Sequence, residues 1–485
     1  MKEKNLQLKI SKYDQNGRGV AFMGTKPYFI DGVLKGELIS YDPETHTVAE
    51  IITPSSARVE PPCGMSGRCG NCHFLYADYA EQLKIKKQMV TEALKDCADP
   101  SLISDVVGMH YPFKYRNKLH LAFAKAGEKI KIGFFEEHSN RVVDFKKCLL
   151  HDKFAEILTQ ILRRFVEKNK IKIYEKKGGQ GLRYAAARYL DGSLMLTLVS
   201  TYSALPAADE LYDELSKNFK EASLYLNVNR LDNSTVFSDK FIHLKGKPYI
   251  EGKLCGIKFE YHPAAFIQIN DSIAAKIYND IEKNSQADAS TTILDIYSGI
   301  GITSVVFAGK GANVYSIELS RDAVKSAAAL KKVYGLSEKI TNICGDAGSE
   351  LTKIALENDD MRAAVKAVNT IKSKNLRAET KPRKPDAPFT AALGKTAQAG
   401  YTSAPKHDKL VAFVDPPRTG LDEKVSKALL RLAPKRIIYL SCNPVTLGEN
   451  LKRFVAAGYK IKYVAPYDMF PQTRHVETLA VLDAE

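Results

Sequence analysis

The sequence predicts a multidomain α/β protein: a small N-terminal β-barrel, a central α+β domain and a C-terminal doubly wound α/β sheet. Three observations support this. The chain has 485 residues, enough for about three domains of roughly 150 residues each. Short strand-like runs broken by turn residues fill residues 1 to about 55. Strands and helices alternate from about residue 266 onward.

The N-terminal residues, 1–57, have the pattern of a small barrel. Apolar, β-prone runs are separated there by turn residues such as Asn16-Gly17. Barrels of this size are a common oligonucleotide-binding architecture. A proline-rich stretch follows and marks the expected boundary with the central domain, residues 58–265.

The central domain is expected to mix helices and strands. Tyr79–Leu94 has a helical pattern, and Asp191-Gly192 is typical of a hairpin turn between two strands. The domain also holds a cysteine cluster with the spacing C-x5-C-x2-C, formed by Cys63, Cys69 and Cys72. Structural disulfides are rare in large cytosolic chains, so the cluster is interpreted as a candidate metal site.

Residues 266–485 have the pattern of a doubly wound α/β domain, whose ligand binds beyond the C-terminal ends of the strands. The expected strands are Thr292–Ile296, Asn313–Ile317, Lys339–Ile343, Leu410–Val414, Arg436–Leu440, Ile461–Ala465 and Val476–Leu482. Residues 350–408, rich in Ala, Lys, Thr and Pro, interrupt the alternation. We expect a flexible insertion there, with a basic RNA-gripping arm as the alternative.

Charge suggests a class of partner. Lysine and arginine number 71 and aspartate and glutamate 56, which gives a formal net charge of +15. Such an excess favours a polyanion, most simply nucleic acid, and a basic solvated surface is the plain alternative. The sequence has no run of about 18 apolar residues and no secretory signal pattern behind Met1. We therefore expect a cytosolic protein without a membrane span.

The motif L-D-I-Y-S-G-I-G (Leu294 to Gly301) ends an expected strand and opens a helix. Its glycines let a ligand approach the backbone closely. Glu318 ends the next strand, where a carboxylate can accept hydrogen bonds from ribose hydroxyls. A dinucleotide fingerprint needs a third Gly or Ala, but Ser304 stands there. A pocket for S-adenosylmethionine (SAM) therefore fits better, with a purely structural turn as the alternative.

Three more motifs follow or begin strands of the same sheet. V-D-P-P-R-T-G (Val414 to Gly420) is a stiff loop that presents Asp415, because its two prolines lack backbone donors. S-C-N-P places Cys442 before a helix whose N-terminus favours the thiolate, although most lone cysteines are small core residues. H-V-E-T places Glu477 at the start of the last strand, where alone it could equally be a salt-bridge partner.

The four motifs together support a functional site more strongly than each does alone, because strand ends and their loops meet at one edge of a sheet. An aspartate, a thiol and a glutamate beside a SAM pocket indicate covalent activation of a weak carbon nucleophile. The C5 atom of a pyrimidine cannot attack a methyl group unaided, but a thiolate that adds at C6 makes C5 enolate-like. After methyl transfer, a base must remove the C5 proton before the thiol leaves.

The motif set resembles that of the RNA uracil-C5-methyltransferases. It comprises F-I-Q-I-N (Phe266 to Asn270), L-D-I-Y-S-G-I-G, V-D-P-P-R-T-G, S-C-N-P and H-V-E-T, and the resemblance covers nearly the whole chain except residues 350–408. It implies a Rossmann-like class I SAM methyltransferase fold for residues 266–485 and a TRAM RNA-binding domain at the N-terminus. The chain departs from some members at Ile302, where they have a polar residue.

The resemblance also implies roles for individual residues. Cys442 would be the nucleophile and Glu477 the base. The SAM site would comprise Gln268, Tyr297, Glu318 and Asp415. Phe266 would lie near the uracil, which must be extruded from folded RNA to be reached. Arg116 and Lys118 would face the RNA.

The cysteines resemble the iron–sulfur site of the ribosomal-RNA branch of the family, with the ligands Cys63, Cys69, Cys72 and Cys148. By spacing alone, all-thiolate ligation suits zinc and an iron–sulfur cluster equally. The resemblance favours a [4Fe-4S] cluster with a structural or RNA-positioning role. We expect Cys97, Cys255 and Cys344 to be ordinary buried thiols.

The function implied by the resemblance is that of a SAM-dependent enzyme that forms 5-methyluridine in 23S ribosomal RNA. We expect the protein to be a monomer. Three alternatives stay open. The same chemistry could act on tRNA uridine, although the cysteines and the barrel argue against it. An exocyclic-amine RNA methyltransferase would share the D-P-P motif but would not need Cys442 or Glu477. An RNA-binding assembly factor without catalysis would not need them either.

Overall fold

The computed structural model describes residues 5–175, 179–231, 235–357 and 409–485. None of the helices within these ranges has the length and hydropathy of a membrane span. Residues 358–408, most of the predicted insertion, lie outside the described residues. Residues 350–357 are helical, and Leu351 and Ile354 are buried in the core of the C-terminal sheet. The expectation of a flexible segment starting at residue 350 is therefore wrong for these positions, because their apolar side chains pack.

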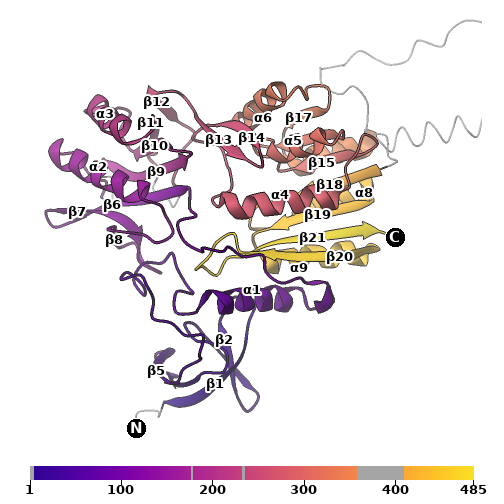
Figure 1. Ribbon diagram of the computed structural model, residues 1–485, viewed down its shortest axis with the longest axis horizontal. Helices are drawn as coiled ribbons and strands as arrows, with labels where there is room; N and C mark the ends of the chain where they lie inside the picture. The colour runs from indigo at the N-terminus through magenta and orange to yellow at the C-terminus, as the bar shows by residue number, and fades with distance from the viewer. Residues whose placement is uncertain (1–4, 176–178, 232–234, 358–408) are drawn as a thin grey trace, which may run out of the picture.

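The N-terminal region is an antiparallel sheet in the order β3-β2-β1-β4-β5, at the bottom of Figure 1. Its strands are β1 (Leu6–Tyr13), β2 (Gly19–Met23), β3 (Lys26–Ile30), β4 (Leu38–Asp42) and β5 (Thr47–Thr53). Leu8 and Ile10 alternate with exposed residues along β1 and lie in a small core of their own. The expected short strands are present, and closure of the sheet into a barrel stays a prediction.

The central region is built on a second sheet, in the order β12-β11-β10-β9-β6-β7-β8, in which β10 and β11 are parallel and the other pairs antiparallel. Its strands are β6 (Lys118–Ala126), β7 (Lys129–Phe135), β8 (Val142–Asp144), β9 (Leu182–Leu190), β10 (Ser193–Ser200), β11 (Glu221–Val228) and β12 (Phe241–Gly246). Helices α2 (Phe154–Lys168) and α3 (Ala208–Asn218) contribute to its core. The predicted turn at Asp191-Gly192 joins β9 to β10, with Asp191 at φ +47°.

A short hairpin, β13 (Ile250–Leu254) and β14 (Ile257–Tyr261), leads into the C-terminal sheet. That sheet has the order β17-β16-β15-β18-β19-β21-β20. Its strands are β15 (Thr292–Ile296), β16 (Asn313–Glu318), β17 (Ile340–Cys344), β18 (Leu410–Val414), β19 (Arg436–Ser441), β20 (Tyr459–Tyr467) and β21 (Glu477–Ala484). Its helices are α4 (Asp271–Ser285), α5 (Ile302–Gly309), α6 (Arg321–Val333), α8 (Glu423–Leu432) and α9 (Pro444–Ala456).

The C-terminal sheet confirms the predicted α/β architecture and adds a feature that the pattern did not reveal. The pairs from β17 to β19 are parallel, whereas β21 is antiparallel to both β19 and β20. Reversal of β21 brings its first residue, Glu477, to the edge at which the parallel strands end.

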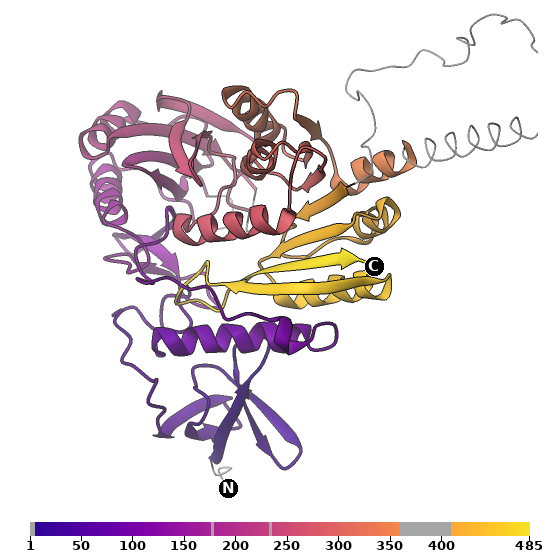
Figure 2. The same ribbon diagram turned by 45° about the vertical axis from the view of Figure 1, so that its right-hand side comes forward.

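Helix α1 (Tyr79–Leu94) lies between the N-terminal strands and β20 and β21, as Figures 1 and 2 both show. On one side Val90 and Leu94 join the core of the C-terminal sheet. On the other side Ile85 and Met89 pack with residues of the N-terminal region. The short 3-10 helix η1 (Pro100–Leu102) follows α1. Although α1 falls within residues 58–265, its packing partners therefore lie in both neighbouring regions.

Candidate active site

The glycine-rich turn after β15 leaves one side of its backbone open. Gly299 and Gly301 have φ values of +56° and +84°, a region that favours glycine. A Cβ at Gly301 would lie 2.9 Å from the Cβ of Ala327, so this part of the turn packs tightly on α6. A Cβ at Gly299 would meet no atom within 4 Å. A ligand can therefore approach the backbone at Gly299.

Two carboxylates lie beside this turn. Glu318 accepts hydrogen bonds from the backbone N–H of Gly299, at 3.0 Å, and of Ser320, at 2.8 Å. Asp295 is fully buried; the hydroxyls of Thr303 and Ser304 donate to its Oδ2, but its Oδ1 has no partner. Burial raises the pKa of Asp295 to about 6. The unpartnered Oδ1 of Asp295 and the carboxylate of Glu318 are hydrogen-bond acceptors beside the open backbone of Gly299. These acceptors fit a ligand with hydroxyl and ammonium donors, such as SAM.

The loop that carries Asp415 joins the first turn to the S-C-N-P motif. The backbone N–H of Asp415 donates to the carbonyl of Ile296 at 3.3 Å. Asn443 Nδ2 donates to the carbonyl of Arg418 at 3.2 Å, and Thr446 Oγ1 donates to the same oxygen at 3.3 Å. Burial raises the pKa of Asp415 to about 7, and the nearby Asp295 carboxylate adds to that effect. The V-D-P-P-R-T-G loop and the S-C-N-P motif are therefore joined by hydrogen bonds at the sheet edge.

Strand register places the proposed nucleophile and base opposite each other. Ser441, the last residue of β19, pairs with Thr478 of the antiparallel β21. One step forward along β19 matches one step back along β21, so Cys442 falls opposite Glu477. Glu477 is only 4% exposed, and Cys442 is partly buried. The two groups are close enough for Glu477 to raise the pKa of the thiol.

The thiol does not have the thiolate character that its place before α9 led us to expect. Burial and the Glu477 carboxylate raise the pKa of Cys442 to about 11 and outweigh the opposing effect of Arg418, which also hydrogen-bonds the sulfur. Burial, together with Asp415, raises the pKa of Glu477 to about 8. The free site therefore holds a protonated thiol and a carboxyl group that is largely protonated at neutral pH.

Arg418 lies at this site, and the sequence analysis did not single it out. Its guanidinium opposes the pKa increases of both Cys442 and Glu477. The signal was present, because Arg418 is the arginine of V-D-P-P-R-T-G. The arginine stands three positions after Asp415 in the same stiff loop.

The F-I-Q-I-N segment leads into α4. Asn270 caps α4 by accepting from the N–H of Ile273 at 3.3 Å. Gln268 is buried, and its carbonyl accepts from Asn117 of the central region at 3.2 Å. Phe266 is 62% exposed. The five strand-edge residues Tyr297, Glu318, Asp415, Cys442 and Glu477 thus share one sheet edge, whereas Gln268 lies on the connection between the central and C-terminal regions.

The four cysteines of the predicted metal site line one apolar pocket: Cys63, Cys69, Cys72 and Cys148. Burial raises the pKa of Cys72 to about 12 and that of Cys148 to about 11. Arg116 lies within electrostatic range of both thiols. Across the described ranges, no three His, Cys, Asp or Glu side chains are arranged to hold a metal ion. The four thiols are the donor type that all-thiolate ligation needs, and they line the same pocket. Their present arrangement in the described residues is not that of a metal site.

The remaining cysteines differ from expectation at one position. Cys97 and Cys255 are half-buried. Cys344 is exposed, so its assignment as a buried thiol is wrong. It is the last residue of β17 and pairs with Glu318, at the edge where the sheet meets solvent.

Comparisons with known proteins agree with the site. Residues 406–485 match a family model described as tRNA (uracil-5-)-methyltransferase, and residues 290–373 match one described as RNA cap guanine-N2 methyltransferase. A Listeria monocytogenes protein named as an uncharacterized RNA methyltransferase is 29% identical, over 99% of this chain and 98% of the relative. A Clostridium tetani protein with the same description is 28% identical, over 99% and 96%.

The crystal structure of the Pyrococcus abyssi tRNA (uracil-54, C5)-methyltransferase with S-adenosyl-L-homocysteine has the same fold. It superposes with a TM-score of 0.68 at 22% identity and covers 98% of this chain and 100% of its own. Fold and strand-edge site define an α/β methyltransferase. The matches confirm the resemblance of the chain to the RNA uracil-C5-methyltransferases, and with it the prediction that the protein is a SAM-dependent methyltransferase enzyme.

Proposed function

We propose that the protein transfers a methyl group from SAM to C5 of a uracil in RNA and forms 5-methyluridine. The observation that carries this proposal is the strand register that sets Cys442 opposite Glu477 beside the open glycine turn. Covalent activation of a pyrimidine requires a thiol and a carboxyl group at one site. Methylation of an exocyclic amine needs neither group.

Four residues hold SAM in this proposal: Gln268, Tyr297, Glu318 and Asp415. Glu318 already accepts from Gly299 and keeps lone pairs for ribose hydroxyls. When bound, SAM supplies an electrophilic methyl group. The unpartnered Oδ1 of Asp295 adds a buried acceptor behind the same turn.

The chain's own groups would act in a fixed order. The Cys442 thiol first releases its proton to water, a step that Arg418 favours by stabilising the negative charge on the sulfur. The thiolate sulfur then bonds to C6. The C5=C6 electrons move toward the C4 carbonyl oxygen, which makes C5 the nucleophile that takes the methyl group. Glu477 acts from its ionised form, which is the minor form at neutral pH because its pKa is about 8, and this carboxylate accepts the C5 proton. The electrons of the C5–H bond restore C5=C6, and the C6–sulfur bond breaks to release the thiolate.

RNA is the proposed partner, and 23S ribosomal RNA the proposed substrate. The formal charge of +15 favours a polyanion, and the exposed ring of Phe266 is available to contact an extruded base. The N-terminal sheet would act as a TRAM-type RNA-binding domain within the division 1–57, 58–265 and 266–485. We further propose a monomer that works in the cytoplasm.

An assay with two RNA substrates tests this function. The protein is incubated with SAM and either 23S ribosomal RNA or tRNA that lacks 5-methyluridine, and the nucleosides are analysed by mass spectrometry. We expect 5-methyluridine in 23S RNA. Its appearance only in tRNA would move the substrate to the alternative class. N2-methylguanosine without 5-methyluridine would overturn the proposal in favour of the amine chemistry that the match over residues 290–373 suggests.

A [4Fe-4S] cluster is proposed for the pocket of Cys63, Cys69, Cys72 and Cys148. All-thiolate ligation would tie the segment around Cys72 to Cys148, and no step of methyl transfer passes through it. Protein purified without oxygen should be brown and contain about four irons per chain. Colourless protein with one zinc ion would overturn the assignment. Cys148→Ser should lose the metal, whereas the half-buried Cys97→Ser serves as the matched control.

A further inference from the structure

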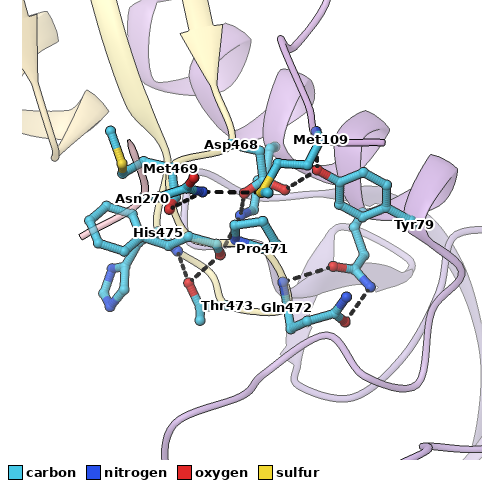
Figure 3. Close-up of polar contacts among 12 residues, drawn as sticks. Tyr79, Met109, Asn270, Asp468, Met469, Pro471, Gln472, Thr473 and His475 are labelled. Atoms are coloured by element: carbon cyan, nitrogen blue, oxygen red, sulfur yellow. Dashed lines mark hydrogen bonds and ion pairs between the residues drawn. The ribbon is translucent and has the colours of Figure 1, made fainter. Parts of the chain in front are cut away.

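The segment between β20 and β21, residues 468–475, ends two residues before Glu477 and is buried. Asp468 is fully buried, and Gln472 is only 3% exposed. Connecting segments usually run over the surface, since their backbone groups need partners. This one receives its partners from elements far away in the sequence, as Figure 3 shows.

Helix α1 supplies the first set of partners. Lys86 pairs with Asp468, both side chains are fully buried, and Lys86 Nζ also donates to the carbonyl of Phe470 at 3.1 Å. The Tyr79 hydroxyl donates to the other oxygen of Asp468 at 2.8 Å and accepts from the N–H of Met109 at 3.0 Å (Figure 3). Each oxygen of the buried carboxylate therefore has its own donor.

The second set of contacts surrounds Gln472, which has the left-handed φ of +70°. Gln82 on α1 donates to its side-chain oxygen at 2.9 Å and accepts from its backbone N–H at 3.1 Å. The backbone N–H groups of His73 and Phe74, just after the cysteine segment, donate to its carbonyl at 2.9 and 3.1 Å. A strained residue held by four hydrogen bonds has one accessible position.

Two further contacts come from other parts of the chain. Asn270, the cap of α4, donates to the carbonyl of Met469 at 3.2 Å. Tyr115 donates to the carbonyl of Pro471 at 3.0 Å. The segment that delivers the proposed base is thus fixed from α1, from the cysteine segment and from α4.

We propose that Lys86 and Gln82 are positioning residues that hold residues 468–475 so that Glu477 faces the Cys442 adduct. The inference rests on the proposed function, because it takes Glu477 as the base. A buried ion pair is not required for stability, since apolar residues of similar volume stabilise a core as well or better. In this proposal the Lys86–Asp468 pair instead fixes the position at which β21 begins.

The test separates the two covalent steps. Lys86→Met and Gln82→Met are compared with wild type for formation of the Cys442–RNA adduct and for its resolution to 5-methyluridine. Lys87→Met is the matched control, because Lys87 is the next residue of α1 and pairs with the exposed Asp105. We expect adduct formation within about twofold of wild type. Resolution should slow by about tenfold or more, since a 1 Å displacement of a catalytic group can cost that much. Methylated adduct should therefore accumulate in both variants but not in the control.

Several outcomes overturn the inference. Equal loss of both steps, in proportion to the folded fraction seen by circular dichroism, would give Lys86 a structural role only. If Lys86→Met does not fold, Gln82→Met decides, because it removes only the contacts to Ala77 and Gln472; unchanged resolution in that variant contradicts the proposal. Wild-type protein that forms neither adduct nor 5-methyluridine would instead refute the proposed function itself.

Discussion

Acidic side chains are buried in two regions of this protein that differ in the donors available to the carboxyl groups. Beneath α1, Asp468 has Lys86 and Tyr79 as donors to its two oxygens. At the strand edge, burial raises the pKa values of Asp295, Asp415 and Glu477 to about 6, 7 and 8. Arg418 is the cation that opposes the increase at Glu477.

The difference separates structure from chemistry. A buried carboxylate with a donor for each oxygen is held in one position, as at Asp468. A buried acid without that compensation shifts its pKa toward neutrality, which is the range in which a group can exchange a proton during catalysis. Asp468 lies in the segment that leads to Glu477, so in our proposal the first region supports the second, which carries the chemistry.

The largest expected effect is at the nucleophile. Cys442→Ala should lower methylation by on the order of 10⁴-fold or more, because no other group can bond to C6. RNA binding should be retained, since one small side chain is removed at a partly buried position. Methyl transfer from labelled SAM and a filter-binding assay measure the two quantities. Turnover near the wild-type rate would show that the strand edge is not the reactive region.

Removal of the base should have the next largest effect on rate. Glu477→Gln keeps the size of the side chain but cannot accept the C5 proton, so turnover should fall by about 10²- to 10⁴-fold. The enzyme should remain attached to methylated RNA, which denaturing gels detect as a slower band. If no adduct survives denaturation, Glu477 is not the base. The different surroundings of Glu477 and Asp468 would then not reflect a difference between a catalytic and a structural acid.

The supporting region should respond in stability. Lys86→Met leaves Asp468 buried without its cation and should cost about 3–5 kcal/mol in the free energy of unfolding. The double variant Lys86→Met with Asp468→Leu should lose much less, because no unpaired charge remains. Urea denaturation of both variants and of Lys87→Met measures the difference. Equal losses in the single and double variants would show that the pair does not behave as a coupled unit.

The smallest expected effect is the change in the free energy of unfolding per pH unit that Glu477 causes. The pKa of Glu477 is raised from 4.5 to about 8 in the folded protein, so the native state holds this proton more tightly than the unfolded state does. Its stabilising contribution is complete below about pH 4.5 and is lost as the pH rises through 8. Glu477→Gln should therefore gain on wild type by at most about 1.4 kcal/mol per pH unit across this window. Thermal denaturation at several pH values measures the gain, and parallel curves would contradict the shifted pKa.

The strand-end motifs could be predicted from the sequence because they are local. A buried β-strand followed by small residues or prolines identifies Tyr297 and Asp415 as edge residues without any knowledge of partners. The protonation of Cys442 could not be predicted. The helix that follows favours the thiolate, but burial and the facing Glu477 decide the pKa, and both arise from strands distant in sequence.

The sequence by itself determined the class of the C-terminal domain, the order of its strands and helices along the chain, and the residue types available at the sheet edge. These follow from hydrophobic periodicity and from turn residues, which act over a few positions. Only the tertiary structure decided that β21 runs antiparallel and sets Glu477 opposite Cys442, and that Lys86 is buried against Asp468. Such contacts join residues far apart in the chain, and their charge states depend on exclusion of water, which no short stretch of sequence controls.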